Sequence, residues 1–512
     1  MTDSTNNKRI AKNTIILYVR MVIMMLISLY TSRVVLKALG IDDFGIYQVV
    51  GSIIVLFSFL NNGLSAASNR FITAEISKGT TESGRIVFNV CLQSHILIAL
   101  IIFIFAETIG LWLVNSVLKI PETRMYAANI VYQISIINSI ISIISSPYNT
   151  TLIAYEKMDI FAYLAVFEAI IKLVIVFLIC IIPGDKLILY AFFLLIASVI
   201  TICINYIYCN KKIIICKFSW VKDKSLLKSI FKFTSWSLLG QTCIVGTNQG
   251  VMILVNYFCG VAVNAAMGIS NQVMNIVNQF VTNFQTAFRP QIVKSYTSNA
   301  YEYLQSLITR SSKITSCLML VFIVPILFEL PHVLSLWLGE YPEYSVEFAQ
   351  WTLIALFFDN ITGPLWMTIN AQTEIKKYQI WTSVFFSMNF FLGWAILIAG
   401  IFPPYAVVIV RSFVYLFLIC VRLYYTKKYF SYFSIKSWTV DVLLKSTAVF
   451  GISAFSVFLF VKHINLPIWQ ELISVVTFSE IIVCALCYMI LFSKSERRFI
   501  KNIIKTKILR KI

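Results

Sequence analysis

The 512-residue sequence is poor in charge: Asp, Glu, Lys and Arg make up only 13% of it, whereas 59% is hydrophobic. A soluble protein has about 25% charged residues, so this sequence could not cover the surface of a globular fold of its length. It has only three histidines, and we therefore expect no metal site and no resident cofactor. Its eleven cysteines form no spacing pattern in a predicted outer loop, which excludes a disulfide framework.

Motifs for enzymatic chemistry are also missing. The sequence has no DxD motif, no Gly-rich phosphate loop and no nucleophile with a matching base. A membrane glycosyltransferase or polymerase needs such a constellation on a sizeable loop, and the longest predicted outer loops have only about a dozen residues. We therefore expect that the protein is not an enzyme, and a glycosyltransferase or polymerase is the least favoured alternative.

The sequence is rich in long apolar segments. A helix of about 20 apolar residues spans the hydrocarbon core of a bilayer. Fourteen candidates lie near residues 14–36, 46–67, 86–114, 125–147, 159–182, 187–209, 233–258, 261–288, 314–338, 346–370, 379–400, 404–425, 442–462 and 470–492. We predict an all-α, polytopic membrane protein with about 14 transmembrane helices.

The basic residues alternate along the chain. Most of the 42 Lys and Arg lie in the termini and in every second gap between apolar segments, and the other gaps are net acidic. Because short cytoplasmic loops retain Lys and Arg, this pattern predicts a multi-pass protein of the bacterial inner membrane with both termini in the cytoplasm. Topology and attraction to anionic lipid headgroups explain the net charge of +19, so we expect membrane lipids and no nucleic acid as partners.

The chain contains an internal duplication. Residues 12–40 match residues 232–260 in length and in both end residues, and Pro147 precedes Ala154 by seven residues just as Pro364 precedes Ala371. Both copies have an even number of segments and hence the same orientation. Parallel repeats of this kind occur in transporters that bind substrate between two halves and alternate access to it.

The duplication predicts six regions. They are a cytoplasmic N-terminus (1–13), a first six-helix bundle (14–209), a basic cytoplasmic linker (210–232), a homologous second six-helix bundle (233–426), C-terminal helices 13 and 14 (427–492) and a basic cytoplasmic tail (493–512). Apolar residues among the lysines of the linker, such as Phe218 and Trp220, suggest an interfacial helix. The tail has the composition of a basic amphipathic helix that lies on the membrane.

A resemblance to a known family is carried by residues 36–79, which read LKALGIDDFGIYQVVGSIIVLFSFLNNGLSAASNRFITAEISKG. The Leu-Gly pair, the element Phe44-Gly45-Ile46-Tyr47, the Gly63 region and Arg70 resemble the first hairpin of the polysaccharide flippases in the multidrug, oligosaccharidyl-lipid and polysaccharide exporter (MOP) superfamily. The sequence looks like the branch that handles O-antigen or capsule repeat units.

This resemblance implies a MATE-like transporter that moves an undecaprenyl-pyrophosphate-linked oligosaccharide from the cytoplasmic to the periplasmic leaflet. It implies a role in lipopolysaccharide or other surface polysaccharide biosynthesis, with polysaccharide polymerase and glycosyltransferases as partners. The main alternative is a multidrug exporter of the same superfamily, coupled to Na⁺ or H⁺, which would favour an acidic, aromatic-lined pocket.

Arginines at bilayer depth are the candidate binding residues for the pyrophosphate. An ionisable side chain there costs roughly 2.5–3.5 kcal/mol on insertion scales, and guanidinium groups suit phosphate oxygens. The candidate cavity cations are Arg20, Arg411, Arg33, Arg70 and Arg289. Snorkelling to the headgroups is an alternative for Arg20 and the favoured role for Arg33 and Arg422, which lie near helix ends.

Three further residues are candidates for ion coupling. Asp359 has no cation within one helical turn and is followed by Gly363-Pro364, so it is either a Na⁺ or H⁺ site or a partner of Arg411. Glu168 and Lys172 are four residues apart, the spacing of a helical ion pair, and they form either a structural salt bridge or part of the pathway.

Uncharged amides provide a second candidate lining. Asn264, Asn271, Asn275, Asn278 and Gln285 recur at spacings of 3, 4 or 7 residues, which places them on one face of a helix. We expect this stripe to face a cavity that accepts hydroxyl-rich sugars. The alternative is hydrogen bonding between helices, which explains a few amides more easily than a whole stripe.

Overall fold

The computed structural model describes residues 3–57, 59–77, 81–155, 157–286, 288, 291–292, 295–296, 300–370, 376–464 and 466–503. Within these ranges the protein consists of helices and their connections, and it has no β-strand. The prediction of an all-α fold is therefore confirmed.

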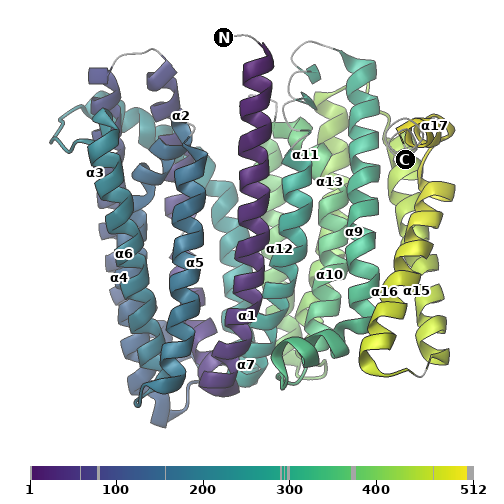
Figure 1. Ribbon diagram of the computed structural model, residues 1–512, viewed down its shortest axis with the longest axis horizontal. Helices are drawn as coiled ribbons and strands as arrows, with labels where there is room; N and C mark the ends of the chain where they lie inside the picture. Colours follow the sequence, from purple (N-terminus) through teal and green to yellow (C-terminus); the bar gives the residue numbers. More distant parts are fainter. Residues whose placement is uncertain are drawn as a thin grey trace. The chain divides into compact units, whose positions relative to one another are not determined.

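The helices follow one another with short connections (Figure 1). They are α1 (Asp3–Phe57), α2 (Phe59–Ser77), α3 (Thr81–Phe105), α4 (Glu122–Ala154), α5 (Met158–Ile181), α6 (Lys186–Lys212), α7 (Lys224–Thr286), α9 (Tyr301–Leu338), α10 (Ser345–Ile361), α11 (Gly363–Asn370), α12 (Lys376–Ala399), α13 (Ala406–Tyr429), α14 (Ile435–Trp438), α15 (Lys445–His463), α16 (Ile468–Leu486) and α17 (Lys494–Ile503). Short π-helical turns continue α3, α14 and α16.

Eleven helices in the described ranges are long and apolar enough to cross a membrane, or twelve if α10 and α11, bent by 45°, form one broken span. α7 runs through two of the segments expected from the sequence, and α1 runs through 14–36 and the first half of 46–67, which continues in α2. Gly40 interrupts α1 with φ 80° and ψ 173°, and Gly260 interrupts α7 with φ 86° and ψ −177°. The sequence predicts about 14 segments. Counting α10 and α11 as one span, and α1 and α7 as two segments each, raises the twelve spans to that number.

Equivalent positions of the duplication have the same local structure. Gly40 and Gly260 adopt the same backbone conformation. Glycine is favoured there because glycine has no Cβ. The Thr151 hydroxyl donates to the carbonyl of Pro147 at 2.8 Å, and the Thr368 hydroxyl donates to that of Pro364 at 2.9 Å. These matches support the duplication, whereas the six region boundaries stay a prediction.

The chain forms two compact units, which we describe separately. Unit 1 comprises Met1–Gly268, Trp337–Glu343 and Leu397–Ala399, and unit 2 comprises Ile269–Leu336, Tyr344–Ile396 and Gly400–Ile512. In unit 1, α4 packs against α2, α3 and α6, and α1 packs against α5. A side chain at Gly45 would collide with the carbonyl of Val261, so this glycine of the Phe-Gly-Ile-Tyr element allows a close helix crossing.

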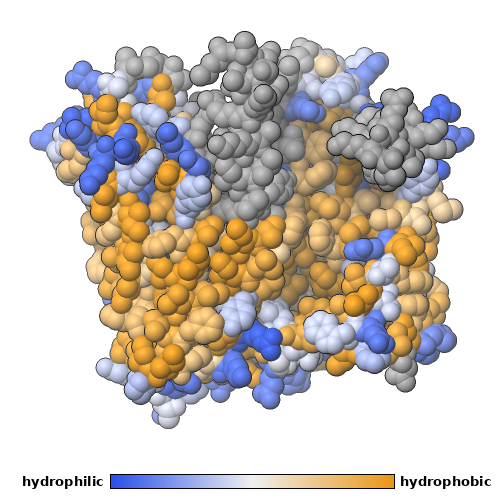
Figure 2. All heavy atoms as spheres, viewed as in Figure 1, coloured by the Kyte–Doolittle hydropathy of each residue, from blue (hydrophilic) through white to orange (hydrophobic). Residues whose placement is uncertain are grey.

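The outer surface of unit 1 suits a bilayer. Leu97, Leu100 and Ile104 of α3 and Phe177 and Ile181 of α5 are exposed. In the part of Figure 2 formed by α3–α6, at its left, an orange apolar band separates hydrophilic ends. Helices satisfy their own backbone hydrogen bonds, so they can present such a surface to lipid. The protein is therefore a multi-pass membrane protein.

The linker between the predicted bundles is not an interfacial helix throughout. Residues 217–223 form no helix, and side-chain amides of α3 bind their backbone. Asn89 donates to the carbonyl of Lys217 at 3.1 Å and accepts from the amide of Ser219 at 2.8 Å. Gln93, with its amide oriented to satisfy both groups, pairs with the backbone N–H and carbonyl of Val221 at 2.9 Å each. The expected helix was therefore wrong for 217–223, although 224–232 belong to α7.

Candidate functional site

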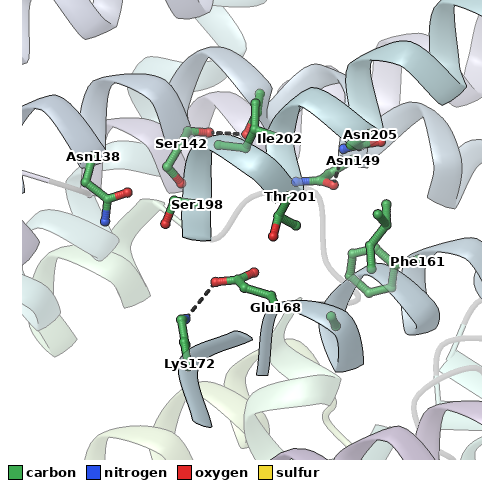
Figure 3. Close-up of a pocket in the computed structure, with 13 residues that line it drawn as sticks. Asn138, Ser142, Asn149, Phe161, Glu168, Lys172, Ser198, Thr201, Ile202 and Asn205 are labelled. Atoms are coloured by element: carbon green, nitrogen blue, oxygen red, sulfur yellow. Dashed lines mark hydrogen bonds and ion pairs between the residues drawn. The ribbon is translucent and has the colours of Figure 1, made fainter. Parts of the chain in front are cut away.

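Unit 1 contains a polar cavity of about 360 Å³ among α4, α5 and α6 (Figure 3). It is lined by Asn138, Ser142, Ser145 and Asn149 of α4, Phe161, Leu164, Ala165, Glu168 and Lys172 of α5, and Ser198, Thr201, Ile202 and Asn205 of α6. The α4 residues recur at spacings of four and three, which places them on one helical face. In the predicted topology the cavity lies in the cytoplasmic half of these helices.

Glu168 and Lys172 form an ion pair on the wall of this cavity. Lys172 Nζ lies 2.6 Å from Glu168 Oε1, and the two side chains are 40% and 32% exposed. Figure 3 shows the Glu168 carboxylate facing Ser198 and Thr201 of α6. The salt bridge and the pathway role left open by the sequence are thus compatible with each other, and ion coupling at this pair stays a prediction.

Hydrogen bonds join the helices around the cavity. Asn205 Nδ2 of α6 donates to Asn149 Oδ1 of α4 at 2.8 Å, and the hydroxyls of Ser65 in α2 and Ser146 in α4 lie 2.7 Å apart. Amide and hydroxyl groups both donate and accept hydrogen bonds. The cavity wall therefore offers the type of group that binds sugar hydroxyls.

In unit 2 the bend between α10 and α11 exposes backbone groups that other helices satisfy. Pro364 has no N–H, so the carbonyl of Asn360 lacks its helical donor, and Gln285 Nε2 donates to it at 2.9 Å. Arg422 Nη1 donates to the carbonyl of Asp359 at 3.1 Å. Because buried backbone groups need partners, these two side chains stabilise the bend.

Asp359 and Arg422 form an ion pair at this bend. Arg422 Nη1 lies 2.8 Å from Asp359 Oδ1, and the Arg422 side chain is only 9% exposed. Arg422 also donates to the Thr362 hydroxyl. The expectation that Arg422 snorkels to the headgroups was therefore wrong, and the ion pair shown for Asp359 is with Arg422, where the sequence had suggested Arg411.

Arg422 is the buried partner of Asp359 that the sequence analysis missed. Arg411 and Arg422 are eleven residues apart, which is about three helical turns, so both lie on one face of α13. Both are buried, and α13 packs against α10. The shared face of the two arginines was the available signal, but the sequence could not show that this face packs on Asp359.

The other predicted cations lie in varied surroundings. The side chains of Arg20, Arg70 and Arg289 lie outside the described residues. Arg33 is exposed on α1, and Arg411 is buried on α13. Their role as binding residues for an anion stays a prediction.

The amide stripe is divided between the two units. Asn264 is buried in unit 1, whereas in unit 2 Asn271 and Asn278 are half-buried, Asn275 is exposed and Gln285 is buried. Asn278 Oδ1 accepts a hydrogen bond from Asn360 Nδ2 at 3.2 Å. Asn278 and Gln285 thus make the contacts between helices that were the alternative, and a cavity lined by all five amides stays a prediction.

In unit 1, on the side predicted to be periplasmic, Arg124 forms ion pairs with two aspartates and so joins three helices. Arg124 lies 2.6 Å from Asp43 Oδ2 and 2.6 Å from Asp185 Oδ2. Asp185 caps α6 by accepting from the amides of Leu187 and Ile188. The hydrogen bond from Arg124 lowers the pKa of Asp185 below its ordinary value. Arg124 therefore connects α4 with α1 and α6.

Comparisons with solved structures define the fold of the protein. The chain is similar to lipid II flippase MurJ in an inward closed conformation, with a TM-score of 0.67 and 14% identity over 94% of this chain and 98% of that one. It is also similar to an inward-facing multidrug resistance MATE family transporter, with a TM-score of 0.62 and 16% identity over 82% and 98% of the two chains. A MOP superfamily transporter from Pyrococcus furiosus gives a TM-score of 0.54 and 14% identity over 84% and 96%. The fold is that of a MOP superfamily membrane transporter.

The family follows from the sequence itself. A model of the family described as polysaccharide biosynthesis protein matches residues 10–296, more than half of the chain. The protein belongs to this family. The matched residues include 36–79, so the resemblance seen in the first hairpin is confirmed. No curated protein sequence matches.

Proposed function

We propose that the protein is a flippase that moves a lipid-linked oligosaccharide repeat unit from the cytoplasmic to the periplasmic leaflet by alternating access. Membership of the polysaccharide biosynthesis protein family supports a saccharide cargo. A fold shared with a protein named as a lipid II flippase supports a cargo carried on lipid. The observation that carries the proposal is the polar cavity of unit 1.

The cavity has the chemistry of a saccharide site. Seven of the lining residues in α4 and α6 are Asn, Ser or Thr, and Phe161 is the one aromatic among the thirteen. A multidrug pocket for organic cations would present aromatic faces and an unpaired acid, whereas Glu168 is paired with Lys172. The wall thus favours an uncharged, hydroxyl-rich group over an organic cation.

The anionic part of the cargo needs cations at bilayer depth. A pyrophosphate crossing hydrocarbon requires donors such as guanidinium groups, because nothing else there replaces its hydration. Of the proposed binding residues, Arg411 is buried in α13 and Arg33 is exposed on α1. Arg422 is held by Asp359, so we assign it to the bend of α10 and α11.

The setting of the function is part of the proposal. We infer a bacterial inner membrane with both chain termini in the cytoplasm, because basic residues gather in alternate loops. The carrier is undecaprenyl pyrophosphate, and transport is driven by a Na⁺ or H⁺ gradient. Glycosyltransferases supply the repeat unit, and a polysaccharide polymerase consumes it, as in O-antigen and lipopolysaccharide synthesis.

The test is transport by the purified full-length protein in liposomes. An undecaprenyl-pyrophosphate-linked oligosaccharide is placed in both leaflets, and an external glycosidase measures how much becomes accessible with time. We expect the inner-leaflet pool to become accessible, and we expect Ser142→Leu, which places an apolar side chain in the cavity, to slow this strongly. Ser456→Leu on α15 is the control.

Two outcomes would contradict the proposal. One is an inner-leaflet pool that stays protected with the wild-type protein, and the other is equal transport by wild type and Ser142→Leu. Ethidium is tested in parallel under Na⁺ and H⁺ gradients. Ethidium accumulation without movement of the lipid-linked sugar would favour the multidrug exporter.

A further inference from the structure

Unit 2 brings together three side chains that the proposed transport path does not use. They are Glu329 and His332 of α9 and Glu471 in the first turn of α16. One potential ligand atom from each lies within 4.8 Å of those from the other two. His332 Nδ1 is 2.9 Å from Glu329 Oε2. Residues far apart in the sequence thus form one compact cluster of a nitrogen ligand and two carboxylates.

The charge of this cluster is not balanced by protein cations. Glu329 is only 1% exposed, and its Oε1 atom is buried without a hydrogen-bond partner. Within the described part of the chain, neither Glu329 nor Glu471 has a Lys or Arg at ion-pair distance. One imidazole cannot neutralise two carboxylates, and an uncompensated buried carboxylate is costly. A cation bound among the three side chains would balance this charge.

The backbone of α9 holds its two ligands on one face. Residues three apart on a helix are neighbours, but Pro331 lies between Glu329 and His332 and cannot donate to the carbonyl of Leu327. Gln350 Nε2 of α10 supplies the missing donor at 2.8 Å. The helix continues through the proline to Leu338, so Glu329 and His332 remain side by side.

We propose that Glu329, His332 and Glu471 form a binding site for a divalent transition-metal ion, with Zn²⁺ as the best fit. Zn²⁺ binds histidine nitrogen and carboxylate oxygen at about 2.0–2.2 Å, and water completes its four ligands when the protein supplies three. Two ligands at this distance from a tetrahedral ion lie roughly 3.3–3.6 Å apart, so the 2.9 Å separation of Glu329 and His332 would widen by about half an ångström around the ion. Mg²⁺ and Ca²⁺ prefer oxygen ligands, so the imidazole selects against them.

The site lies where a bound ion would join α9 to α16. His332 and Glu471 are half-buried, so an ion can reach the buried Glu329 carboxylate from the aqueous side. The charge pattern predicts this end of α9 and α16 to be periplasmic. An ion bound there joins α9 of the second bundle to α16 of the C-terminal pair. The proposal stands independently of the flippase function.

The experiment measures Zn²⁺ binding by the full-length protein in detergent. The protein is treated with EDTA, dialysed and titrated with ZnCl₂ in a calorimeter, with MgCl₂ and CaCl₂ as comparison ions. We expect one Zn²⁺ per chain with micromolar or tighter affinity and much weaker binding of Mg²⁺ and Ca²⁺. X-ray absorption should show one nitrogen ligand and oxygen ligands.

Variants separate this site from adventitious binding. His332→Ala and Glu471→Gln should each lower the Zn²⁺ affinity at least 100-fold, beyond the 10–100-fold that loss of an outer-shell partner typically causes. His463→Ala removes an exposed histidine of α15 outside the cluster and should change nothing. Glu471→Gln alters a half-buried residue, so it remains informative if Glu329→Gln fails to fold.

The proposal would be overturned by either of two results. One is wild-type protein that binds no Zn²⁺ in the micromolar range. The other is Zn²⁺ affinity unchanged in folded His332→Ala and Glu471→Gln, or lowered equally by His463→Ala, because the ion would then occupy another site.

Discussion

Arg422 of α13 and Asp359 of α10 are joined by an ion pair of 2.8 Å although 63 residues separate them in the sequence. The same guanidinium binds the carbonyl of Asp359 and the hydroxyl of Thr362. Arg422 therefore holds the backbone at the bend as well as the carboxylate beside it. This double contact points to a structural role for the pair.

Loss of Arg422 should destabilise the protein more than loss of the whole charge pair. Breaking a buried pair typically costs about 3–5 kcal/mol, and less is expected here because Asp359 is 30% exposed. We expect Arg422→Met to lower the unfolding temperature, and we expect Asp359→Asn added to it to recover part of the loss. Thermal unfolding in detergent measures both. No recovery in the double variant would contradict a mainly electrostatic pair.

The coupling alternative for Asp359 gives a different result. If Asp359 binds Na⁺ or H⁺, Asp359→Asn should abolish the dependence of transport on the ion gradient while unfolding is little changed. We expect the reverse, namely lowered stability with the gradient dependence retained. Transport assays under imposed Na⁺ and H⁺ gradients distinguish the two outcomes.

A side chain at Gly40 or Gly260 should lower the stability of the protein. Both have φ near +80° with ψ of 173° and −177°, a backbone region that is essentially restricted to glycine and costs another residue roughly 1–3 kcal/mol. We expect Gly40→Ala and Gly260→Ala to lower stability by about that amount each. Gly51→Ala is the matched control, because Gly51 is helical and no atom lies within 4 Å of an added Cβ. Similar unfolding temperatures for all three variants would contradict backbone strain at Gly40 and Gly260.

The sequence predicted the features that depend on local pattern. Apolar segments and alternating basic loops predicted the spanning helices, and the self-match predicted that Gly40 and Gly260 are equivalent. It could not predict contacts between distant segments. Arg422 looked like a snorkelling residue because its partner Asp359 lies on another helix. Residues 217–223 looked amphipathic because their binding to Asn89 depends on how the linker folds onto α3.

The C-terminal helix α17 is held by a buried lysine. Lys313 of α9 lies 3.1 Å from Glu496, and its side chain is 5% exposed. Ser493 donates its backbone N–H to Glu496 Oε2 at 2.7 Å, which forms half of a capping box at the start of α17. The expected amphipathic tail is thus helical over Lys494–Ile503, and it is attached to α9.

Attachment of α17 should depend on pH. Burial raises the pKa of Glu496, but hydrogen bonds from Ser493 and the charge of Lys313 outweigh it and lower the pKa below its ordinary value. A lowered pKa in the folded state gives stability that is present at neutral pH and is lost as the pH falls through that lowered pKa. Protection of α17 against hydrogen exchange, taken relative to the intrinsic exchange rate at each pH, should therefore fall at low pH.

Glu496→Gln tests this attachment at constant pH. The variant leaves Lys313 buried without its partner, so the protection of α17 at neutral pH, relative to the intrinsic exchange rate, should fall to that of the wild type in acid. Lys494→Gln in the same turn changes an exposed residue, so it is the control and should leave protection unchanged. Equal protection in Glu496→Gln and wild type would show that the ion pair does not hold the helix.

The cavity ion pair of Glu168 and Lys172 should matter more for transport than for stability. An i,i+4 pair on an accessible face contributes only about 0.3–0.5 kcal/mol, and both side chains are about one-third exposed. Glu168→Gln leaves an unpaired ammonium in the cavity wall, so it should slow flipping of the lipid-linked sugar with little change in unfolding temperature. Adding Lys172→Met removes the unpaired charge and should restore flipping. A double variant as inactive as Glu168→Gln would instead assign the carboxylate itself to ion coupling.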